Sequence, residues 1–396
     1  MYKSFKTEIA PTKEQKTKIL RSIGIARFLY NQYVAYNTRL YKMYRRGLLA
    51  DNQKRFLSAM DFNKYVNHTL KKKLPWIDEC GSKARKKVMV DAEHAFRNFF
   101  SGKSSYPKFK KKTNQDIQLY FNHNGKGDWR IWRHKITIPT FKQVRLKEYG
   151  YLPVGAYATN GKVSYKAGRF YVSVLIDIDE NSKYNKDLKT SYSESTDGIG
   201  IDLGIKNLAI ISDGKTYPNI NKTYKIKRLK KRLKREMKRY SRKLTSKKST
   251  SNNTKSNLNK QQIKMQKLYQ RILNIRKDYE NKVVHNIIKQ KPRFITVEKL
   301  RIKNMIKNKH LAHAILEQRF CNFIQKLKCK AEIVGIEIRI VDAFYPSSKR
   351  CHCCGHIHKE LKLKDRIYIC PICGYKADRD YNASLNLRDA EKYQIA

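Results

Sequence analysis

The stretch GIGIDLGIKNLAIISDG, residues 198–214, decides how the second half of this chain folds. It contains two short apolar runs, 198–203 and 208–212, on either side of a turn at Gly204. Short apolar runs bounded by turn residues are typical of buried strands. One residue departs from this pattern, because Asp202 lies within the first apolar run. A carboxylate in a buried strand has to pair with a base or hold a cation, since an unpaired buried charge is costly.

Two further acids have the same character. Glu298 ends the apolar run Phe-Ile-Thr-Val-Glu, and Asp380 lies at the predicted start of a helix. Three carboxylates that converge across a sheet can bind two magnesium ions about 3.5–4 Å apart, which suits phosphodiester cleavage. The other interpretation of each acid is a salt bridge, because the chain has 88 Lys and Arg residues. Placement on strands favours metal binding, but the pattern does not separate Asp378 from Asp380 as the third acid.

Five of the eight cysteines fall within 23 residues. Four of them form two C-x-x-C pairs, each followed by a glycine, and this spacing is typical of a zinc ribbon. Four thiolates close a tetrahedral shell, so the predicted zinc is structural rather than catalytic. The predicted ligands are Cys351, Cys354, Cys370 and Cys373. Cys353, His352 and His356 lie in or beside the first pair and are the competing ligands.

The charge balance indicates a polyanionic partner. Of 396 residues, 88 are Lys or Arg and 33 are Asp or Glu, which gives a net charge of +55. Such self-repulsion favours binding to nucleic acid, while a hydrophobic fraction of 40% is enough for folded cores. The first residues do not resemble a secretory signal, and no window reaches the roughly 18 apolar residues of a membrane span. We therefore expect an intracellular, cytoplasmic protein with no membrane partner.

The basic residues are most concentrated at 225–248, which holds fourteen Lys or Arg and one Glu. Apolar residues recur there at spacings of three and four, and again at 265–283. With the polar loop 246–257 between them, these segments predict an antiparallel helical hairpin. A solvated charged face is the simpler interpretation, but charge of one sign favours phosphate contact.

The rest of the chain alternates between helical and strand patterns. A strand at 2–9 precedes a helical block at 11–102, which opens with a capping box at Thr12 and Gln15. Short strands at 103–180 predict a small barrel or sandwich that the first strand completes, so that the helical block is an insertion. The other predicted elements are a linker at 181–196, strands at 294–298 and 336–341, a helix at 311–334 and a short helix after Asp380.

Taken in order, these motifs resemble those of the transposon-encoded TnpB nucleases. Residues 200–208 are similar to the first RuvC-type motif of that family and residues 296–300 to the second. The cysteine pairs followed by Asp-Arg-Asp-Tyr-Asn-Ala, residues 378–383, resemble its zinc finger running into the third motif. Upstream, the runs at 96–100, 106–110 and 11–15 are also similar to family motifs.

The resemblance implies an α+β multidomain protein. A β-barrel wedge domain would carry an inserted helical recognition domain, and an RNase H-like (RuvC) α/β nuclease domain would carry an inserted zinc ribbon. The implied boundaries are 1–10 and 103–185 for the wedge, 11–102 for the recognition domain, 195–345 and 375–396 for the nuclease domain with its hairpin at 222–290, and 346–374 for the ribbon.

The resemblance also implies an RNA-guided DNA endonuclease, with Asp202, Glu298 and Asp380 as the catalytic, magnesium-binding acids. Its guide RNA would come from the transposon end, its target would be double-stranded DNA next to a short transposon-associated motif, and it would act as a monomer or weak dimer. Lys206 and Arg379, beside the acids, are candidates for phosphate contacts. Two alternatives stay open: a DNA-cutting transposase without guide RNA, and a nuclease-inactive guided DNA binder.

Overall fold

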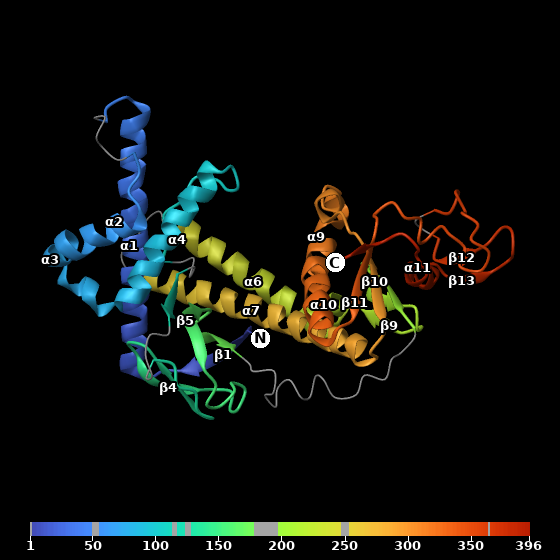
Figure 1. Ribbon diagram of the computed structural model, residues 1–396, viewed down its shortest axis with the longest axis horizontal. Helices are drawn as coiled ribbons and strands as arrows, with labels where there is room; N and C mark the ends of the chain where they lie inside the picture. The colour runs from blue at the N-terminus through green and yellow to red at the C-terminus, as the bar shows by residue number, and fades with distance from the viewer. Residues whose placement is uncertain are drawn as a thin grey trace. The chain divides into compact units, whose positions relative to one another are not determined.

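The computed structural model describes residues 2–49, 55–112, 117–122, 128–177, 197–246, 253–362 and 365–396. The chain divides into two compact units, Met1–Ser182 and Lys183–Ala396. Each unit has its own hydrophobic core and mixes helices with strands (Figure 1). The predicted linker at 181–196 lies outside the described residues. In the described part of the chain, no helix is long and apolar enough to cross a membrane.

The helices of the first unit pack through aromatic side chains. Thr12 and Gln15 form the predicted capping box at the start of the first helix. Tyr33 is fully buried there, with its ring centroid 5.2 Å from that of Phe62 and 6.3 Å from that of Phe96. Packing therefore accounts for this tyrosine. The elements are α1 (Lys13–Arg45), α2 (Ala59–Tyr65), η1 (Val66–Leu70), α3 (Lys71–Lys73), η2 (Pro75–Glu79) and α4 (Ser82–Phe100).

A six-stranded antiparallel sheet forms the rest of this unit. Its strands are β1 (Tyr2–Ala10), β2 (Gln118–Asn122), β3 (Lys135–Ile138), β4 (Lys142–Leu146), β5 (Ala158–Lys166) and β6 (Arg169–Asp177). They lie in the order β2-β5-β6-β1-β4-β3. The first strand of the chain thus lies inside the sheet, between β6 and β4. This confirms that the N-terminal strand completes the sheet and that the helices lie between β1 and β2 in sequence.

The second unit is built on a mixed sheet in the order β14-β11-β10-β7-β8-β9. Its strands are β7 (Ile199–Asp202), β8 (Asn207–Ile211), β9 (Thr216–Pro218), β10 (Phe294–Glu298), β11 (Glu337–Val341) and β14 (Gln394–Ile395). The central strands β7, β10 and β11 are parallel. Their carboxyl ends therefore meet at one edge of the sheet.

Long helices cover one face of this sheet. Alternate residues of a strand point to opposite faces, and Ile199 and Ile201 share a core with residues of α7 and α10. The helices of the whole second unit are η3 (Ile220–Lys222), α6 (Tyr224–Ser246), α7 (Asn253–Lys289), α8 (Ile302–Met305), α9 (Lys309–Gln318), α10 (Phe320–Val334) and α11 (Arg379–Arg388). Outside this sheet, β12 (Ile367–Ile369) pairs with β13 (Lys376–Asp378) next to the cysteine pairs.

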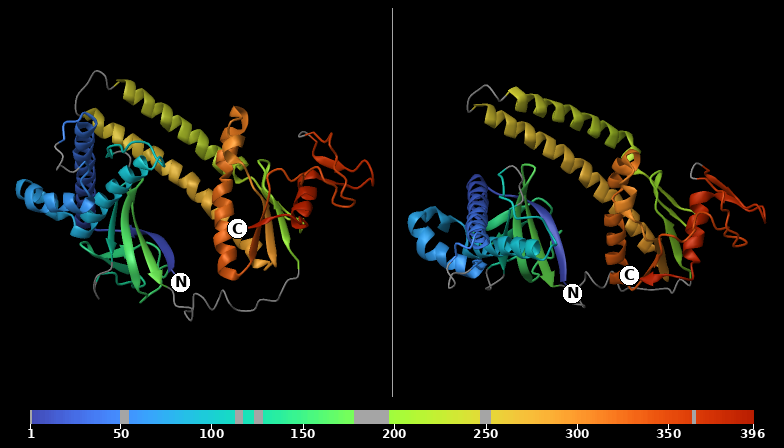
Figure 2. Two further views of the ribbon diagram at one scale, coloured as in Figure 1. Left: turned by 45° about the horizontal axis from the view of Figure 1, so that its top comes forward. Right: turned by 90° about the horizontal axis from the view of Figure 1, so that it is seen from above.

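The predicted helical hairpin is confirmed. Helices α6 and α7 run side by side, as the two views of Figure 2 show. Leu229 and Leu233 of α6 pack on Leu268 and Ile272 of α7. The remaining faces of α6 carry exposed Lys and Arg residues, as the sequence pattern predicts. Residues 247–252 of the connecting loop lie outside the described residues.

The single helix predicted at 311–334 is wrong. The chain forms two helices, α9 and α10, and Arg319 between them has a left-handed φ of 58°. Tertiary polar contacts hold this break. Arg319 Nη1 lies 3.0 Å from the buried Glu280 carboxylate, and Gln318 donates a 2.8 Å hydrogen bond to the Gly204 carbonyl. Helical periodicity alone does not reveal such contacts.

Candidate carboxylate site and cysteine metal centre

Asp202 and Glu298 lie at the carboxyl ends of adjacent parallel strands. Ile201 of β7 pairs with Val297 of β10, so the next residue of each strand is one of these acids. The sequence predicts two acids on strands, and the sheet makes them neighbours at one edge. Because residues alternate between faces, Asp202 points to the opposite face from Ile201, away from the core formed with α7 and α10.

Helix α11 brings Asp380 to the same place. It packs on β7, β8 and β10, and glycine at position 200 permits the close approach to β7. A Cβ atom on Gly200 would lie 1.9 Å from the Ser384 carbonyl oxygen and 2.4 Å from the Arg388 backbone nitrogen. Real Cβ contacts do not come so close. The chain therefore brings together three acids that lie far apart in sequence, at 202, 298 and 380.

The structure separates Asp378 from Asp380. Asp378 Oδ1 accepts the backbone N–H groups of Asp380, at 2.9 Å, and Tyr381, at 3.1 Å, so Asp378 is the N-cap of α11. Asp380 is not used as a cap, and its carboxylate oxygen Oδ1 lies 3.1 Å from Arg379 Nη2. Capping gives Asp378 a local structural role. The geometry therefore favours Asp380 as the third acid of the site.

Burial and nearby negative charges raise the pKa of two of these acids, Asp202 and Glu298. Burial raises the pKa of Asp202 to about 7, and the negative charges of Asp380 and Glu298 add to that effect. The pKa of Glu298 also rises to about 7, through burial and then through the charge of Asp342. Carboxylates in this situation repel one another unless a cation lies between them. The donor chemistry of the site, oxygen only, fits magnesium.

Sequence reasoning missed Asp342. This exposed acid directly follows β11, and its neighbour Val341 is the register partner of Glu298. The available signal was an acid immediately after a predicted strand, the same signal that marked Glu298. Among the described residues, the four cysteines are the one group of three or more candidate ligands whose donor atoms all lie within 4.8 Å of one another. The carboxylates are more widely spaced than that.

The cysteine pairs converge as predicted. The Sγ atoms of Cys351 and Cys373 lie 3.6 Å apart, and those of Cys354 and Cys370 lie 3.5 Å apart. A tetrahedral zinc ion with bonds of about 2.3 Å separates its sulfur ligands by about 3.8 Å. The observed spacing is thus compatible with one zinc ion. Cys353 is not part of this four-cysteine group, so the arrangement favours the four predicted ligands over Cys353.

Both cysteine pairs have the same turn. Gly355 N–H donates to the Cys351 carbonyl at 2.9 Å, and Gly374 N–H donates to the Cys370 carbonyl at 3.1 Å. Both glycines have positive φ, 74° and 73°, which glycine adopts without strain. Neither His352 nor His356 belongs to the four-cysteine group among the described residues, and His352 Nδ1 lies 3.5 Å from Asp389 Oδ2.

Helix α11 is also bound to the cysteine segment. Asn382 and Asn386 are both buried, and both donate 2.7 Å hydrogen bonds to the Arg350 carbonyl, one residue before the first cysteine. Asn386 also donates to the Ser347 carbonyl at 2.8 Å. The helix that carries Asp380 therefore joins the sheet to the cysteine centre.

The two predicted phosphate-contacting side chains have different environments. Lys206 is exposed in the turn after β7. The Arg379 side chain is 12% exposed and is paired with Asp380. Neither environment tests contact with phosphate, so both roles stay predictions.

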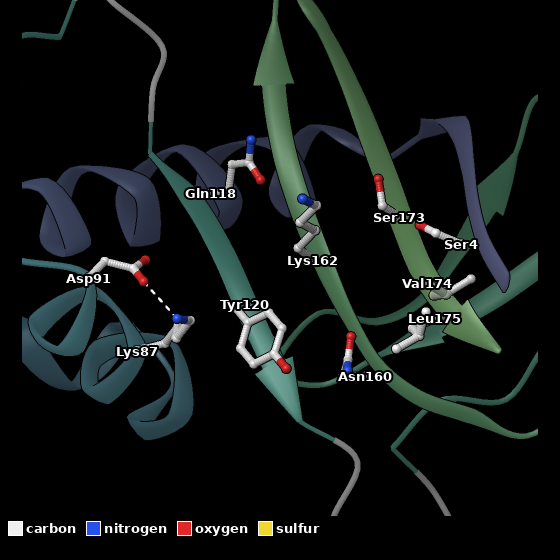
Figure 3. A pocket seen from close by; sticks show the side chains of 10 residues that line it. All are labelled: Ser4, Lys87, Asp91, Gln118, Tyr120, Asn160, Lys162, Ser173, Val174 and Leu175. Atoms are coloured by element: carbon white, nitrogen blue, oxygen red, sulfur yellow. Dashed lines mark hydrogen bonds and ion pairs between the residues drawn. The ribbon is translucent and has the colours of Figure 1, made fainter. Parts of the chain in front are cut away.

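The first unit holds a separate hollow of about 370 Å³ between α4 and the sheet. Gln118, Tyr120 and Lys162 project toward it from β2 and β5, and the ion pair of Lys87 and Asp91 lies at its edge (Figure 3). Polar side chains and the apolar Val174 and Leu175 both line it, and apolar surface makes up the larger part of the lining.

Comparison with known proteins gives a consistent family assignment. Residues 176–309 match the OrfB_IS605 family, described as a probable transposase, residues 1–46 match its helix-turn-helix domain, and residues 320–387 match a Cas12f1-like TNB domain. A putative RNA-guided DNA endonuclease of Streptomyces pristinaespiralis is 27% identical over 390 residues, covering 97% of this chain and 88% of that protein.

Another relative, the putative RNA-guided DNA endonuclease InsQ of Escherichia coli (strain K12), is 26% identical over 97% of this chain and 91% of its own length. The solved structure of a Cas12f1–sgRNA–target DNA complex has a similar fold, with a TM-score of 0.58 and 14% identity over 100% of this chain and 99% of that one. Family models thus match the beginning, the middle and the end of the chain, and relatives align along nearly all of it; together these matches support a protein of the TnpB family.

Proposed function

We propose that this protein is an RNA-guided DNA endonuclease that hydrolyses target DNA at the carboxylate site of its second unit. The observation that carries the proposal is the meeting of Asp202, Glu298 and Asp380 at one sheet edge, where each carboxylate is next to another negative charge. Such a site is poorly suited to stability and well suited to binding divalent cations. The aligned relatives named as RNA-guided DNA endonucleases support the same activity.

In this proposal the three acids would hold two magnesium ions. When bound, the ions supply Lewis-acid activation of water and stabilise the leaving oxygen. The acids themselves are held by backbone: Asp202 and Glu298 by paired parallel strands, and Asp380 by a capped helix docked on Gly200. Arg379 neutralises part of the charge of Asp380 until a cation or a phosphate takes its place.

The proposed architecture follows from the resemblance. The antiparallel sheet of the first unit would be the wedge domain and its helices the recognition domain, with the boundaries given above. The second unit would combine an RNase H-like nuclease domain with a structural zinc ribbon. Guide RNA would neutralise much of the net charge of +55, with the hairpin of α6 and α7 among its contacts. Specificity would come from guide pairing and a short motif beside the target.

The first experiment is to purify the protein from a host that carries its native locus and to sequence the RNA that accompanies it. We expect one defined RNA species that abuts the gene, and magnesium-dependent cleavage of DNA that matches its guide segment. Asp202→Asn should abolish cleavage and leave RNA binding intact. Heterogeneous RNA fragments would refute the guided activity and favour an unguided transposase. Guided binding without cleavage by the unmodified protein would favour a nuclease-inactive binder.

A further inference from the structure

Phe344 is a large exposed aromatic side chain in the segment that follows β11, the strand that pairs with β10 at Glu298. The residue is 76% exposed, although burial of an aromatic ring is favourable. Isolated exposed apolar residues are common on protein surfaces. Exposure alone therefore does not indicate a role for this ring, whereas its position and its neighbours do.

Its position follows from the sheet. Strand β11 ends at Val341, the register partner of Glu298, and the next backbone hydrogen bond runs from Lys299 N–H to the Val341 carbonyl at 2.9 Å. Phe344 lies three residues beyond the end of β11, and Arg301 lies three residues beyond the end of β10. Three residues span at most about 11 Å. Both side chains therefore leave the sheet at the edge where the acids meet.

The two side chains stack on each other. The guanidinium carbon of Arg301 lies 4.2 Å from the centroid of the Phe344 ring. A turn fixes the backbone that carries the ring, because Asp342 Oδ1 accepts the Phe344 N–H at 2.9 Å. No ion pair joins Arg301 to any residue that the structure describes, so its charge is available to an external anion. With three quarters of its surface exposed, the ring keeps an accessible face.

An accessible ring next to an available guanidinium is the chemistry that binds single-stranded nucleic acid. Bases stack on aromatic faces regardless of sequence, and arginine adds a cation–π contact and a phosphate contact. The exposed Lys299 and Lys303 on the same segment add positive charge. A base within a duplex is already stacked on its neighbours, so this site selects an unpaired base.

We propose that Phe344 and Arg301 form a stacking site for one unpaired base of the DNA strand that enters the carboxylate site, with Arg301 contacting the backbone phosphate of that nucleotide. This inference rests on the proposed function. Phe344 is a positioning residue: it holds the strand so that the adjacent phosphodiester reaches the acids. The occupant is DNA rather than guide RNA, because Phe344 follows β11, whose last residue Val341 pairs with Glu298, and the strand to be cut has to reach that acid.

Cleavage kinetics test the positioning role. Phe344→Ala should slow guided cleavage by about 5- to 160-fold, the range expected for loss of one base–aromatic stack, whereas Phe344→Trp should restore most of the rate. Ile395→Ala is the matched control, because Ile395 is 72% exposed and lies on β14, which pairs with β11. Equal rates for Phe344→Ala and the unmodified protein would overturn the proposal.

A fluorescent base tests the stacking itself. In the Asp202→Asn background, which does not cut, 2-aminopurine is placed at successive positions of the displaced DNA strand and, separately, of the guide RNA. We expect quenching at one DNA position, lost on adding Phe344→Ala and retained with Phe344→Trp. The proposal would be overturned if Phe344→Ala left the quenching unchanged, or if it changed the quenching only of 2-aminopurine in the guide RNA.

The two proposals fail differently. If the unmodified protein cuts no guided DNA, the proposed function fails, and titration of a free 2-aminopurine single strand still reports whether Phe344 stacks on a base. If the unmodified protein cuts and Asp202→Asn does not, but Phe344→Ala has the unmodified rate and quenching, only the stacking site fails.

Discussion

Gly200→Ala should uncouple the third acid from the other two. The new methyl group would lie 1.9 Å from the Ser384 carbonyl oxygen and 2.4 Å from the Arg388 nitrogen, and both are backbone atoms that no side-chain rotation can move. An ordinary contact begins at 3.4 Å, so α11 has to move away from β7 by about 1.5 Å, the difference between 3.4 and 1.9 Å. Asp380 would move with it.

A misplacement of about 1 Å can cost about 10²-fold in rate. We therefore expect guided cleavage to fall about 100-fold, equivalent to about 2.7 kcal/mol of activation free energy. Overpacking should also destabilise the unit by about 1–3 kcal/mol. The affinity of the variant for target DNA should stay within a few-fold of that of the unmodified protein, because base pairing with the guide and contacts to the nucleic-acid backbone supply it. The assay is single-turnover cleavage at saturating protein, with target binding and thermal melting measured in parallel.

Gly204→Ala provides the matched control. A Cβ atom at Gly204 would meet its nearest neighbour, the Asn207 carbonyl oxygen, at 3.4 Å, and this glycine does not have a positive φ. We expect that variant to cleave at nearly the unmodified rate. If Gly200→Ala cleaves as fast as Gly204→Ala while remaining folded, the close contact between α11 and β7 does not set the geometry of the site.

Three further predictions concern the metals and the charge. Cys354→Ser should lose bound zinc, measured by elemental analysis, and lower the melting temperature, whereas Cys353→Ser should keep one zinc ion per chain; equal zinc contents would contradict the assignment. Because the folded state of the magnesium-free protein raises the pKa of Asp202 to about 7, this group contributes stability at low pH that is lost as the pH rises from about 4 to about 7. Asp202→Asn should therefore melt higher than the unmodified protein at pH 8 in magnesium-free buffer and lose that advantage at pH 4; a lower melting temperature at pH 8 would contradict the repulsion among the acids. Lys231, Lys234 and Lys238 are exposed lysines of α6. Replacing all three with glutamine should reduce the slope of the logarithm of RNA affinity against the logarithm of salt concentration by about 2 to 3. An unchanged slope would exclude the hairpin from the interface.

Sequence reasoning succeeded where the signal is local. Asp202 and Glu298 are recognisable because each lies in an apolar run, and the cysteine pairs because their spacing allows few other structures. The break at Arg319 was missed because it depends on the buried Glu280, which is 39 residues away in the chain. The helical spacing of apolar residues continues on both sides of Arg319, so the pattern predicts one continuous helix.

The choice between Asp378 and Asp380 also depended on three dimensions. In sequence both acids precede the same helix, and only the hydrogen bonds from the backbone to Asp378 show which of them is the cap. Asp342 was overlooked for the related reason that its importance comes from the parallel pairing of β10 with β11. Strand order is not encoded in the local pattern around that residue.

The distribution of the three acids has a consequence for protein synthesis. A ribosome delivers Asp202 and Glu298 well before α11, and Asp380 follows Asp202 by 178 residues. A nascent chain can form paired β7 and β10 while its site still lacks the third carboxylate. The asparagines of α11 then bind the cysteine segment. If these acids form the proposed catalytic site, a chain that ends before α11 lacks one of them and should not cleave DNA.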